Sequence, residues 1–344
     1  MKTSLYIITN ESISLSEGVY KCDNIDMKSI PESLQENNFN VCIFARESKF
    51  KRIKNINLVK IKIFNNIFSY IFNLIKSFRD EKNKYLVISI SPYTFFAVIF
   101  LKLFRKKIFV YLRSDGYEEY KEIIGILGPA IYYWMLKIVT FKSIVITCQE
   151  RLFPKEKSHL VYPSELNSSW LQNLQKAPLG KPKLLYVGRA RVEKGIFSII
   201  KIFNEIKTDI QFSIVARMDE DSKIKNFQNI KKINFLGHGF NSSELISIYD
   251  SHNIFILPSY TEAHPKVLDE SLARERPVII FEEIKHVIQN RKGIFVSKRN
   301  SISFLQTINY IIKNYKDIQE EMKKNRLPSK KNFILQMKNI LNSN

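Results

Sequence analysis

The sequence contains little cysteine, little histidine and few acidic residues, and it has no long apolar run. It holds three cysteines and five histidines in 344 residues. Cys22, Cys42 and Cys148 are scattered and odd in number, and neither they nor the histidines have the spacing of a metal site. These shortages argue against a disulfide framework and predict a protein of the reducing cytoplasm.

Long apolar segments are also missing. The longest uncharged stretch, Tyr85 to Leu101, is interrupted by Pro92 and two serines, which favours strand, loop and helix over a membrane span. The first apolar run turns polar by Thr9, too early for a signal peptide. We therefore expect neither a leader nor a spanning helix.

Acidic residues are outnumbered by basic ones, 33 against 54, so the formal net charge is +21. With 45% hydrophobic and 25% charged residues the composition is globular, which excludes disordered, collagen-like and coiled-coil chains. Residues 49–84 are the most basic segment, with only Asp80 and Glu81 as acids. The chain has no basic tail, so we expect no nucleic-acid partner. Phosphorylated ligands or an anionic membrane surface remain as partners.

Short β-branched runs alternate with helical patterns, and this alternation occurs twice along the chain. The predicted strands are Leu5–Ile8, Asn40–Phe44, Leu86–Ile90, Ile108–Leu112, Ile144–Thr147, Lys183–Val187, Gln211–Val215, Ile233–Leu236, Ile254–Leu257, Val278–Phe281 and Gly293–Val296. Such alternation predicts an α/β protein with parallel sheets in two Rossmann-like domains that face a cleft. We expect the domains at 1–164 and 183–312, joined by a polar linker at 165–182, with a helical segment at 313–344.

The segment after Lys183–Val187 has the features of a phosphate site. Gly188 permits a tight turn, and Arg189 and Lys194 place two cations beside a predicted helix start. Backbone N–H groups at a helix start also attract anions, so the combination suits a diphosphate. The alternative is an ordinary strand–helix loop in a lysine-rich chain.

Two carboxylates follow the strand Ile254–Leu257. Pro265 suits the first position of a helix, which places Glu262 in the preceding loop and Glu270 in the second turn. Carboxylates accept hydrogen bonds from sugar and ribose hydroxyls. The alternative is that Glu262 caps the helix and that Glu270 is a solvated surface acid.

Together, these segments resemble the retaining glycosyltransferases of family 4, over Lys183 to Phe295. The matching residues are Leu185-Tyr186-Val187-Gly188-Arg189, Glu193-Lys194-Gly195, Phe235-Leu236-Gly237, Glu244-Leu245, Tyr249, Ile256-Leu257-Pro258-Ser259, Glu262, Glu270 and Arg276-Pro277-Val278-Ile279. The resemblance implies the GT-B fold, with the donor bound by the second domain. It also implies that the C-terminal helices of 313–344 pack back on the first domain.

The resemblance assigns roles to the donor-site residues. Arg189 and Lys194 would bind the donor diphosphate and stabilise the leaving group, and Gly188 would lie beside it. Glu262 would act at the reacting face of the donor sugar, Glu270 would hold the ribose, and backbone amides of the segment His264, Pro265, Lys266 and Val267 would meet the phosphates.

The sequence departs from the family pattern at several positions. Ala263 and Pro265 stand where the family usually has glycine, and His264 replaces a common aromatic residue. His264 would contact the sugar or phosphate, or else pack. Arg217 follows the strand Gln211–Val215 in place of a glycine-rich turn and would add a phosphate contact.

The first half resembles the family less. Gly18, in Glu17-Gly18-Val19, is a remnant of a glycine-rich turn and would approach the donor phosphate. Arg113 and Asp115 follow the strand Ile108–Leu112. Asp115 is the candidate acceptor contact or general base, and Arg113 would pair with it or bind an acceptor phosphate. The alternative for Asp115 is that it starts the turn before a helix at Tyr117–Ile124.

We expect no metal and no other cofactor beyond a UDP- or GDP-sugar substrate. Asp219-Glu220-Asp221 fits a pattern that binds a metal in another glycosyltransferase fold, but such short acidic patterns occur often by chance.

Two lysine-rimmed helical patterns could lie on a membrane. In the first, apolar residues from Phe64 to Phe78 recur at helical spacing and are flanked by lysines. In the second, Lys102, Arg105, Lys106 and Lys107 border an apolar face of phenylalanine and leucine side chains within Phe95–Phe109. The alternative is that both apolar faces pack on the sheet. Because the first domain of this family takes the acceptor, which is often a lipid carrier, we expect peripheral association with the inner face of the plasma membrane.

The predicted function is that of a hexosyltransferase-type, metal-independent retaining enzyme. It would move a sugar from a nucleotide-sugar to a glycan, polyprenyl-linked or lipid A-core acceptor in bacterial capsule, O-antigen or lipopolysaccharide synthesis. The alternatives are an inverting GT-B enzyme and a non-catalytic membrane-associated relative.

Overall fold

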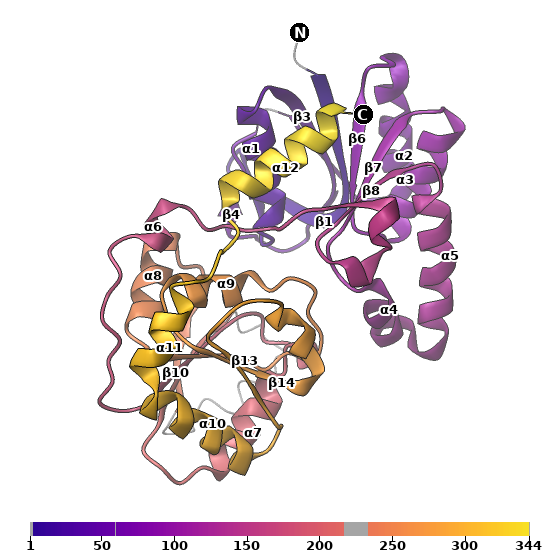
Figure 1. Ribbon diagram of the computed structural model, residues 1–344. Coiled ribbons are helices and arrows are strands. Elements are labelled where there is room, and N and C mark those ends of the chain that lie inside the picture. The colour runs from indigo at the N-terminus through magenta and orange to yellow at the C-terminus, as the bar shows by residue number, and fades with distance from the viewer. Residues whose placement is uncertain (1–2, 59, 217–232, 344) are drawn as a thin grey trace. The chain divides into compact units, whose positions relative to one another are not determined.

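The computed structural model describes residues 3–58, 60–216 and 233–343. The chain divides into two compact units, Met1–Pro163 with Lys331–Asn344 (unit 1) and Ser164–Lys330 (unit 2) (Figure 1). Each unit is built on its own largely parallel sheet, so the predicted α/β class with two parallel-sheet domains is confirmed.

Unit 1 is a sheet with helices on both faces. Its strands are β1 (Thr3–Ser16), β2 (Val19–Cys22), β3 (Phe39–Glu47), β4 (Lys54–Asn55), β5 (Ile61–Phe64), β6 (Lys84–Ile88), β7 (Lys107–Leu112), β8 (Ile144–Thr147) and β9 (Ser158–Leu160). Its helices are α1 (Asp26–Glu36), α2 (Ile67–Lys76), α3 (Pro92–Leu103), α4 (Gly116–Ile124), α5 (Gly128–Thr140) and α12 (Lys330–Ser343). The parallel order is β5-β3-β1-β6-β7-β8-β9, and β2 and β4 extend from β1 in antiparallel pairing.

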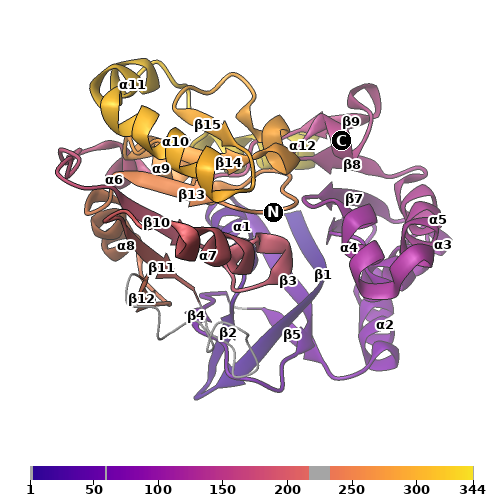
Figure 2. The same cartoon turned by 90° about the horizontal axis from the view of Figure 1, so that it is seen from below.

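The two faces of this sheet are covered by different helices (Figures 1 and 2). Buried side chains of α2, α3 and α5 share one core cluster with Val110 and Leu112 of β7. On the opposite face, Phe333 of α12 packs with its ring centroid 6.4 Å from that of Tyr111. Successive residues of a strand point to opposite faces, so β7 is buried on both sides.

Unit 2 contains a second, fully parallel sheet. Its strands are β10 (Lys183–Val187), β11 (Gln211–Val215), β12 (Ile233–Gly237), β13 (Ile254–Leu257), β14 (Val278–Phe281) and β15 (Ile294–Ser297). Its helices are α6 (Ser168–Leu171), α7 (Ile196–Glu205), α8 (Ser242–Asp250), α9 (Lys266–Ala273), α10 (Ser301–Lys313) and α11 (Tyr315–Met322). The order is β12-β11-β10-β13-β14-β15. β13 and β14 are buried along their whole length, which explains their uninterrupted apolar sequences.

The first strand differs from its prediction. It continues past Ile8 to Ser16, because the polar residues after Ile8 are accommodated within the strand by a register shift between Ile8 and Ser12. Glu17 and Gly18, with φ of 55° and 75°, then form a two-residue hairpin turn into β2. Gly18 therefore lies in a hairpin turn at the end of β1, and its contact with the donor stays a prediction.

The predicted helix at 63–78 is also shorter than expected. Ile61–Phe64 is the edge strand β5, and α2 begins only after Asn66, whose side chain accepts a hydrogen bond from the Ser69 backbone N–H at 2.8 Å. An asparagine cap thus separates strand from helix within one apolar pattern.

Residues 165–182 are not a free linker, because they are fastened to unit 2. Leu166 and Trp170 lie in the core of this unit. The buried guanidinium of Arg274 donates to the backbone carbonyls of Trp170, Gln172 and Asn173 at 2.9–3.0 Å. The polar composition of the segment did not indicate either the two buried side chains or the hydrogen bonds from Arg274.

The C-terminal segment divides between the two units. Tyr315 of α11 is buried in unit 2, where its hydroxyl donates to the Asn253 carbonyl at 2.7 Å. Unit 1 takes the chain only from Lys331 onward, as α12. The expected return to the first domain therefore involves the last helix, not all of 313–344. Within the described ranges, no helix combines the length and the apolarity needed to cross a bilayer.

Candidate donor-binding site

The two motifs that the sequence singled out follow adjacent strands of unit 2. β10 and β13 pair in parallel, with Leu184 opposite Ile254, so their carboxyl ends meet at one edge of the sheet. Gly195, at φ 66°, allows the loops to touch, since a Cβ there would lie 1.8 Å from the Pro258 carbonyl oxygen. The Tyr260 backbone N–H donates to the Glu193 carbonyl at 2.9 Å and holds the loops together.

The central contact of the site is an ion pair between these loops. Lys194 Nζ lies 2.6 Å from Glu262 Oε1, and the two side chains are 20% and 11% exposed. Ser259 donates its hydroxyl proton to the same carboxylate oxygen at 2.7 Å. His286 Nε2 donates to the Glu262 backbone carbonyl at 2.7 Å. Glu262 is thus held from three sides, in place of the capping role that was its alternative.

Arg299 supports this loop and was missed in the sequence. Its guanidinium lies 4.1 Å from the Tyr260 ring centroid and 4.3 Å from that of Phe281, and donates to the Pro258 carbonyl at 3.0 Å. Glu283 neutralises it at 2.8 Å. The sequence feature that could have revealed Arg299 is its position just after the last strand, β15, at the same edge of the sheet as the two loops.

Gly188 and Arg189 occupy the start of the β10 loop. The Gly188 backbone N–H donates to the Val215 carbonyl at 3.0 Å, and the buried Tyr186 hydroxyl donates to the Arg189 carbonyl at 2.7 Å. Burial raises the pKa of Tyr186 well above its usual range, so the hydroxyl stays a donor. The Arg189 side chain is exposed and has no ion-pair partner among the described residues, which leaves a free cation beside Lys194.

Glu270 is partly buried, not a solvated surface acid. Tyr249 donates its hydroxyl proton to Glu270 Oε2 at 3.1 Å and lies 3.3 Å from the Val267 carbonyl. Desolvation raises the pKa of Glu270 to about 7, because an apolar setting disfavours the charged form. The group therefore titrates near neutral pH.

His264 belongs to a buried polar cluster. Its Nε2 lies 3.0 Å from Asp269 Oδ2, the two side chains are 3% and 1% exposed, and Arg291 pairs with the other Asp269 oxygen. His264 Nδ1 has no hydrogen-bond partner in the part of the chain that is described. Of the two roles considered for His264, packing is the one its surroundings display.

The remaining residues of the second motif start α9. Pro265 was predicted to be the first helical residue but is the N-cap, so the helix begins one residue later, at Lys266. Lys266 Nζ pairs with Glu165 Oε1 at 2.9 Å. Val267 packs against the core of unit 2, so its contribution to a ligand would come from its backbone.

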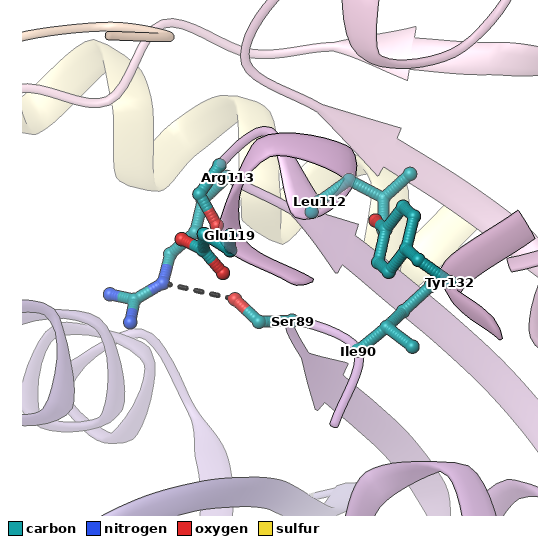
Figure 3. Close-up of a pocket in the computed structure, with 8 residues that line it drawn as sticks. Ser89, Ile90, Leu112, Arg113, Glu119 and Tyr132 are labelled. Atoms are coloured by element: carbon teal, nitrogen blue, oxygen red, sulfur yellow. Dashed lines mark hydrogen bonds between the residues drawn. The ribbon is translucent and has the colours of Figure 1, made fainter. Parts of the chain in front are cut away.

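Arg113 in unit 1 makes contacts other than those expected. Its guanidinium pairs with Asp26 and Glu11, each at 2.7 Å, and its Nε donates to Ser89 Oγ at 3.2 Å (Figure 3). Its two ion-pair partners thus come from α1 and β1, and Asp115 pairs instead with Arg151. A small pocket beside it is lined by Ser89, Arg113, Glu119 and Tyr132 among others.

Asp115 is the N-cap of α4. Its Oδ1 accepts from the Tyr117 and Glu118 backbone N–H groups at 3.1 and 3.5 Å, and Arg151 lies 3.2 Å from its Oδ2. These contacts are those of the alternative considered for this residue, a turn-starting aspartate. The role of Asp115 as a general base stays a prediction.

Two predictions fall outside the described residues. Arg217 and the acidic segment Asp219-Glu220-Asp221 both belong to the range 217–232. Among the described residues, no group of three or more histidine, cysteine or carboxylate side chains could hold a metal ion.

Comparisons with known proteins find a family match within unit 2. Residues 172–327 match the sequence profile of the family Glycosyl transferases group 1. An uncharacterized glycosyltransferase of Haemophilus influenzae is 24% identical over 57% of this chain and 53% of its own length. The N,N'-diacetylbacillosaminyl-diphospho-undecaprenol alpha-1,3-N-acetylgalactosaminyltransferase of Campylobacter jejuni is 24% identical over 52% of this chain and 46% of its own length. The chain thus spans about half the length of these curated relatives.

Solved structures share the fold over nearly the whole chain. Sucrose-phosphate synthase from Thermosynechococcus elongatus superposes with a TM-score of 0.72 at 15% identity, over 99% of both chains. HepE from Anabaena, in complex with UDP and glucose, gives 0.72 at 12% identity over 100% of both. The fold is therefore that of the GT-B glycosyltransferases. The family match, by contrast, covers only residues 172–327, which lie in unit 2.

Proposed function

We propose that the protein transfers a sugar from a nucleotide-sugar to a lipid-linked or glycan acceptor, with retention of anomeric configuration and without a metal. The observation that carries this proposal is the Lys194–Glu262 contact of 2.6 Å. It joins a cationic phosphate motif to a carboxylate motif at the carboxyl edge of one parallel sheet, where α/β proteins bind ligands.

In this proposal, Lys194 and Arg189 bind the donor diphosphate. Their positive charges stabilise the negative charge that grows on the diphosphate as its bond to the anomeric carbon breaks. The N-terminus of α9 adds the backbone N–H groups of Lys266 and Val267 on the same side of the sheet edge. Glu270 accepts hydrogen bonds from the ribose hydroxyls.

The proton of the acceptor hydroxyl goes to the departing diphosphate. The acceptor oxygen attacks the anomeric carbon from the same face that the diphosphate leaves, so the anomeric configuration is retained. This approach also brings the acceptor hydroxyl near a phosphate oxygen, which takes its proton. No protein base is assigned to this step, since Asp115 is occupied as a helix cap. Glu262 lies nearest the reacting carbon and supports positive charge there.

Relatives support the choice of substrates. HepE is described in complex with UDP and glucose, which favours UDP over GDP in the donor. The Campylobacter jejuni relative carries diphospho-undecaprenol in its name, which favours a polyprenyl-linked acceptor over lipid A-core. We accordingly propose a role in bacterial surface polysaccharide synthesis, at the inner face of the plasma membrane.

The test is a thermal-shift screen against UDP- and GDP-sugars, followed by transfer with undecaprenyl-diphosphate-linked saccharides. A ligand that binds only the native state raises the melting temperature. We expect one UDP-sugar to stabilise the protein and the product to keep the donor anomer by NMR. An inverted product would refute the mechanism, and an absence of any nucleotide-sugar effect would refute the function.

A further inference from the structure

The helical hairpin of unit 1 ends in an exposed aliphatic tip. Ile123 and Ile124, at the end of α4, and Ile126 and Leu127, in the turn before α5, are 76%, 46%, 93% and 65% exposed. Large side chains so exposed are normal when they are single, but a contiguous group marks an interaction site.

The hairpin is held tightly at its base. A Cβ on Gly116 would lie 2.0 Å from the Tyr132 ring, and one on Gly128 would lie 2.0 Å from the Tyr120 carbonyl oxygen. Tyr117 stacks edge-on against Tyr132, with ring centroids 4.9 Å apart. The two helices therefore approach closely, and the aliphatic tip is presented by a fixed support.

The apolar surface continues from the tip along the outer sides of α5 and α3. These two helices contact one another, and Lys102 of α3 donates to the carbonyls of Ile138 and Phe141 beyond α5. The exposed apolar side chains on them and just after them are Phe96, Ile99, Leu103, Phe104, Ile131, Tyr133, Trp134, Ile138 and Phe141. On the neighbouring α2, Phe68 and Phe72 are 83% and 59% exposed.

Charge on α2, α3 and α5 has one sign. α2, α3 and α5 contain no aspartate or glutamate, and their only ionic side chains are Lys76, Lys102 and Lys137. Lys137 lies 5.1 Å from the Trp134 ring centroid, and Lys76 lies 4.2 Å from that of Phe72. In α4, Glu118 and Glu119 lie in the first turn, at the base of the hairpin, and Glu122 directly precedes the tip in the sequence.

We propose that this face docks on an anionic lipid bilayer, with the tip 123–127 in the acyl region and Trp134 and Tyr133 at the headgroups. A protein partner of matching shape would gain from charged complementarity of both signs, whereas three adjacent acid-free helices with lysines beside aromatic rings suit anionic headgroups. Aliphatic side chains at a projecting turn suit insertion.

The position of the tip fits the chemistry proposed for the protein. Gly116, Glu119 and Tyr132, at the base of the hairpin, line the pocket beside Arg113. Docking through the tip would bring this pocket to the membrane surface, where a lipid-linked acceptor is found. The docking inference deepens the proposed function but is tested without sugar transfer, so each can fail alone.

Vesicle flotation of the full chain is the first test. The Ile123→Asp/Ile126→Asp variant places two charges on the tip, and Ile302→Asp is the matched control, since Ile302 is 72% exposed on α10 of unit 2. We expect the wild type and the control to bind phosphatidylglycerol-containing vesicles equally, and the tip variant at least about tenfold more weakly. Equal binding of the tip variant would overturn the inference.

Tryptophan fluorescence gives a second reading that needs no tip variant. The chain has two tryptophans, Trp134, which is 58% exposed, and Trp170, which is 2% exposed in unit 2. Vesicles should shift the emission to the blue and brominated lipids should quench it, and Trp134→Phe should abolish both effects. No change in the wild type would contradict docking. Docking would also be contradicted if the wild type formed dimers without lipid and the tip variant did not, because this face would then bind a second copy of the chain.

Discussion

Lys194 and Glu262 are 68 residues apart in the chain, and their side chains meet at 2.6 Å. The contact exists because β10 and β13 are neighbours and because Gly195 lets the two loops touch. A partly buried pair of this kind holds each group in place, and removal of one leaves the other uncompensated.

The pair predicts how two substitutions affect transfer. Lys194→Ala and Glu262→Ala should each reduce sugar transfer by at least about 100-fold, because in the proposed mechanism each removes a charge that acts on the transition state. Circular dichroism and melting should show a folded protein in both cases. Arg326→Ala, an exposed cation of unit 2, is the control and should retain full turnover. Unaffected turnover of either loop variant would refute the site.

Glu270 predicts a pH dependence of stability. Its pKa is about 7 in the folded protein, against 4.5 for an ordinary glutamate, so the folded state holds the proton across that window while the unfolded state releases it. Stability should therefore fall as pH rises from 4.5 to 7, and Glu270→Gln should flatten this fall. Urea unfolding followed by Trp170 in a Trp134→Phe background reports on unit 2. Identical pH profiles for the two proteins would contradict the raised pKa.

Gly195 and Gly18 form a matched pair, since both have positive φ, of 66° and 75°. Alanine at Gly18 meets no atom within 4 Å and should cost only the left-handed strain, about 1–2 kcal/mol. Alanine at Gly195 also collides with the Pro258 carbonyl, so it should lower the melting temperature further and raise the donor KM. If Gly18→Ala also raised the donor KM, the result would indicate that Gly18 contacts the donor.

Asp115→Asn separates capping from catalysis. Asparagine caps a helix as well as aspartate does, but it cannot accept a proton from an acceptor hydroxyl. Because the Asp115 carboxylate caps α4, we expect turnover to change by less than about threefold and melting to stay constant. A general base would instead give a loss of about 100-fold or more, together with a changed pH–rate profile.

The strands of unit 2 could be predicted because each is a short apolar run between polar turns. β10, β11, β13 and β14 have the predicted limits, and their order along the chain placed Lys194 and Glu262 at one sheet edge. The partners of Arg113 could not be predicted in this way. Asp26 and Glu11 lie 87 and 102 residues away, and local sequence offered the nearer Asp115 instead. The extension of β1 was hidden for a similar reason, since Thr9 to Glu11 look like a strand end.

Calorimetric titration of UDP into the wild type, Lys194→Ala and Glu262→Gln tests the donor site most directly. In the free protein Lys194 is engaged by Glu262, so the diphosphate has to compete for it. We predict that Lys194→Ala weakens UDP binding at least about tenfold, whereas Glu262→Gln strengthens it while abolishing transfer. Equal affinity in all three proteins would contradict the assignment of this loop pair to the donor diphosphate.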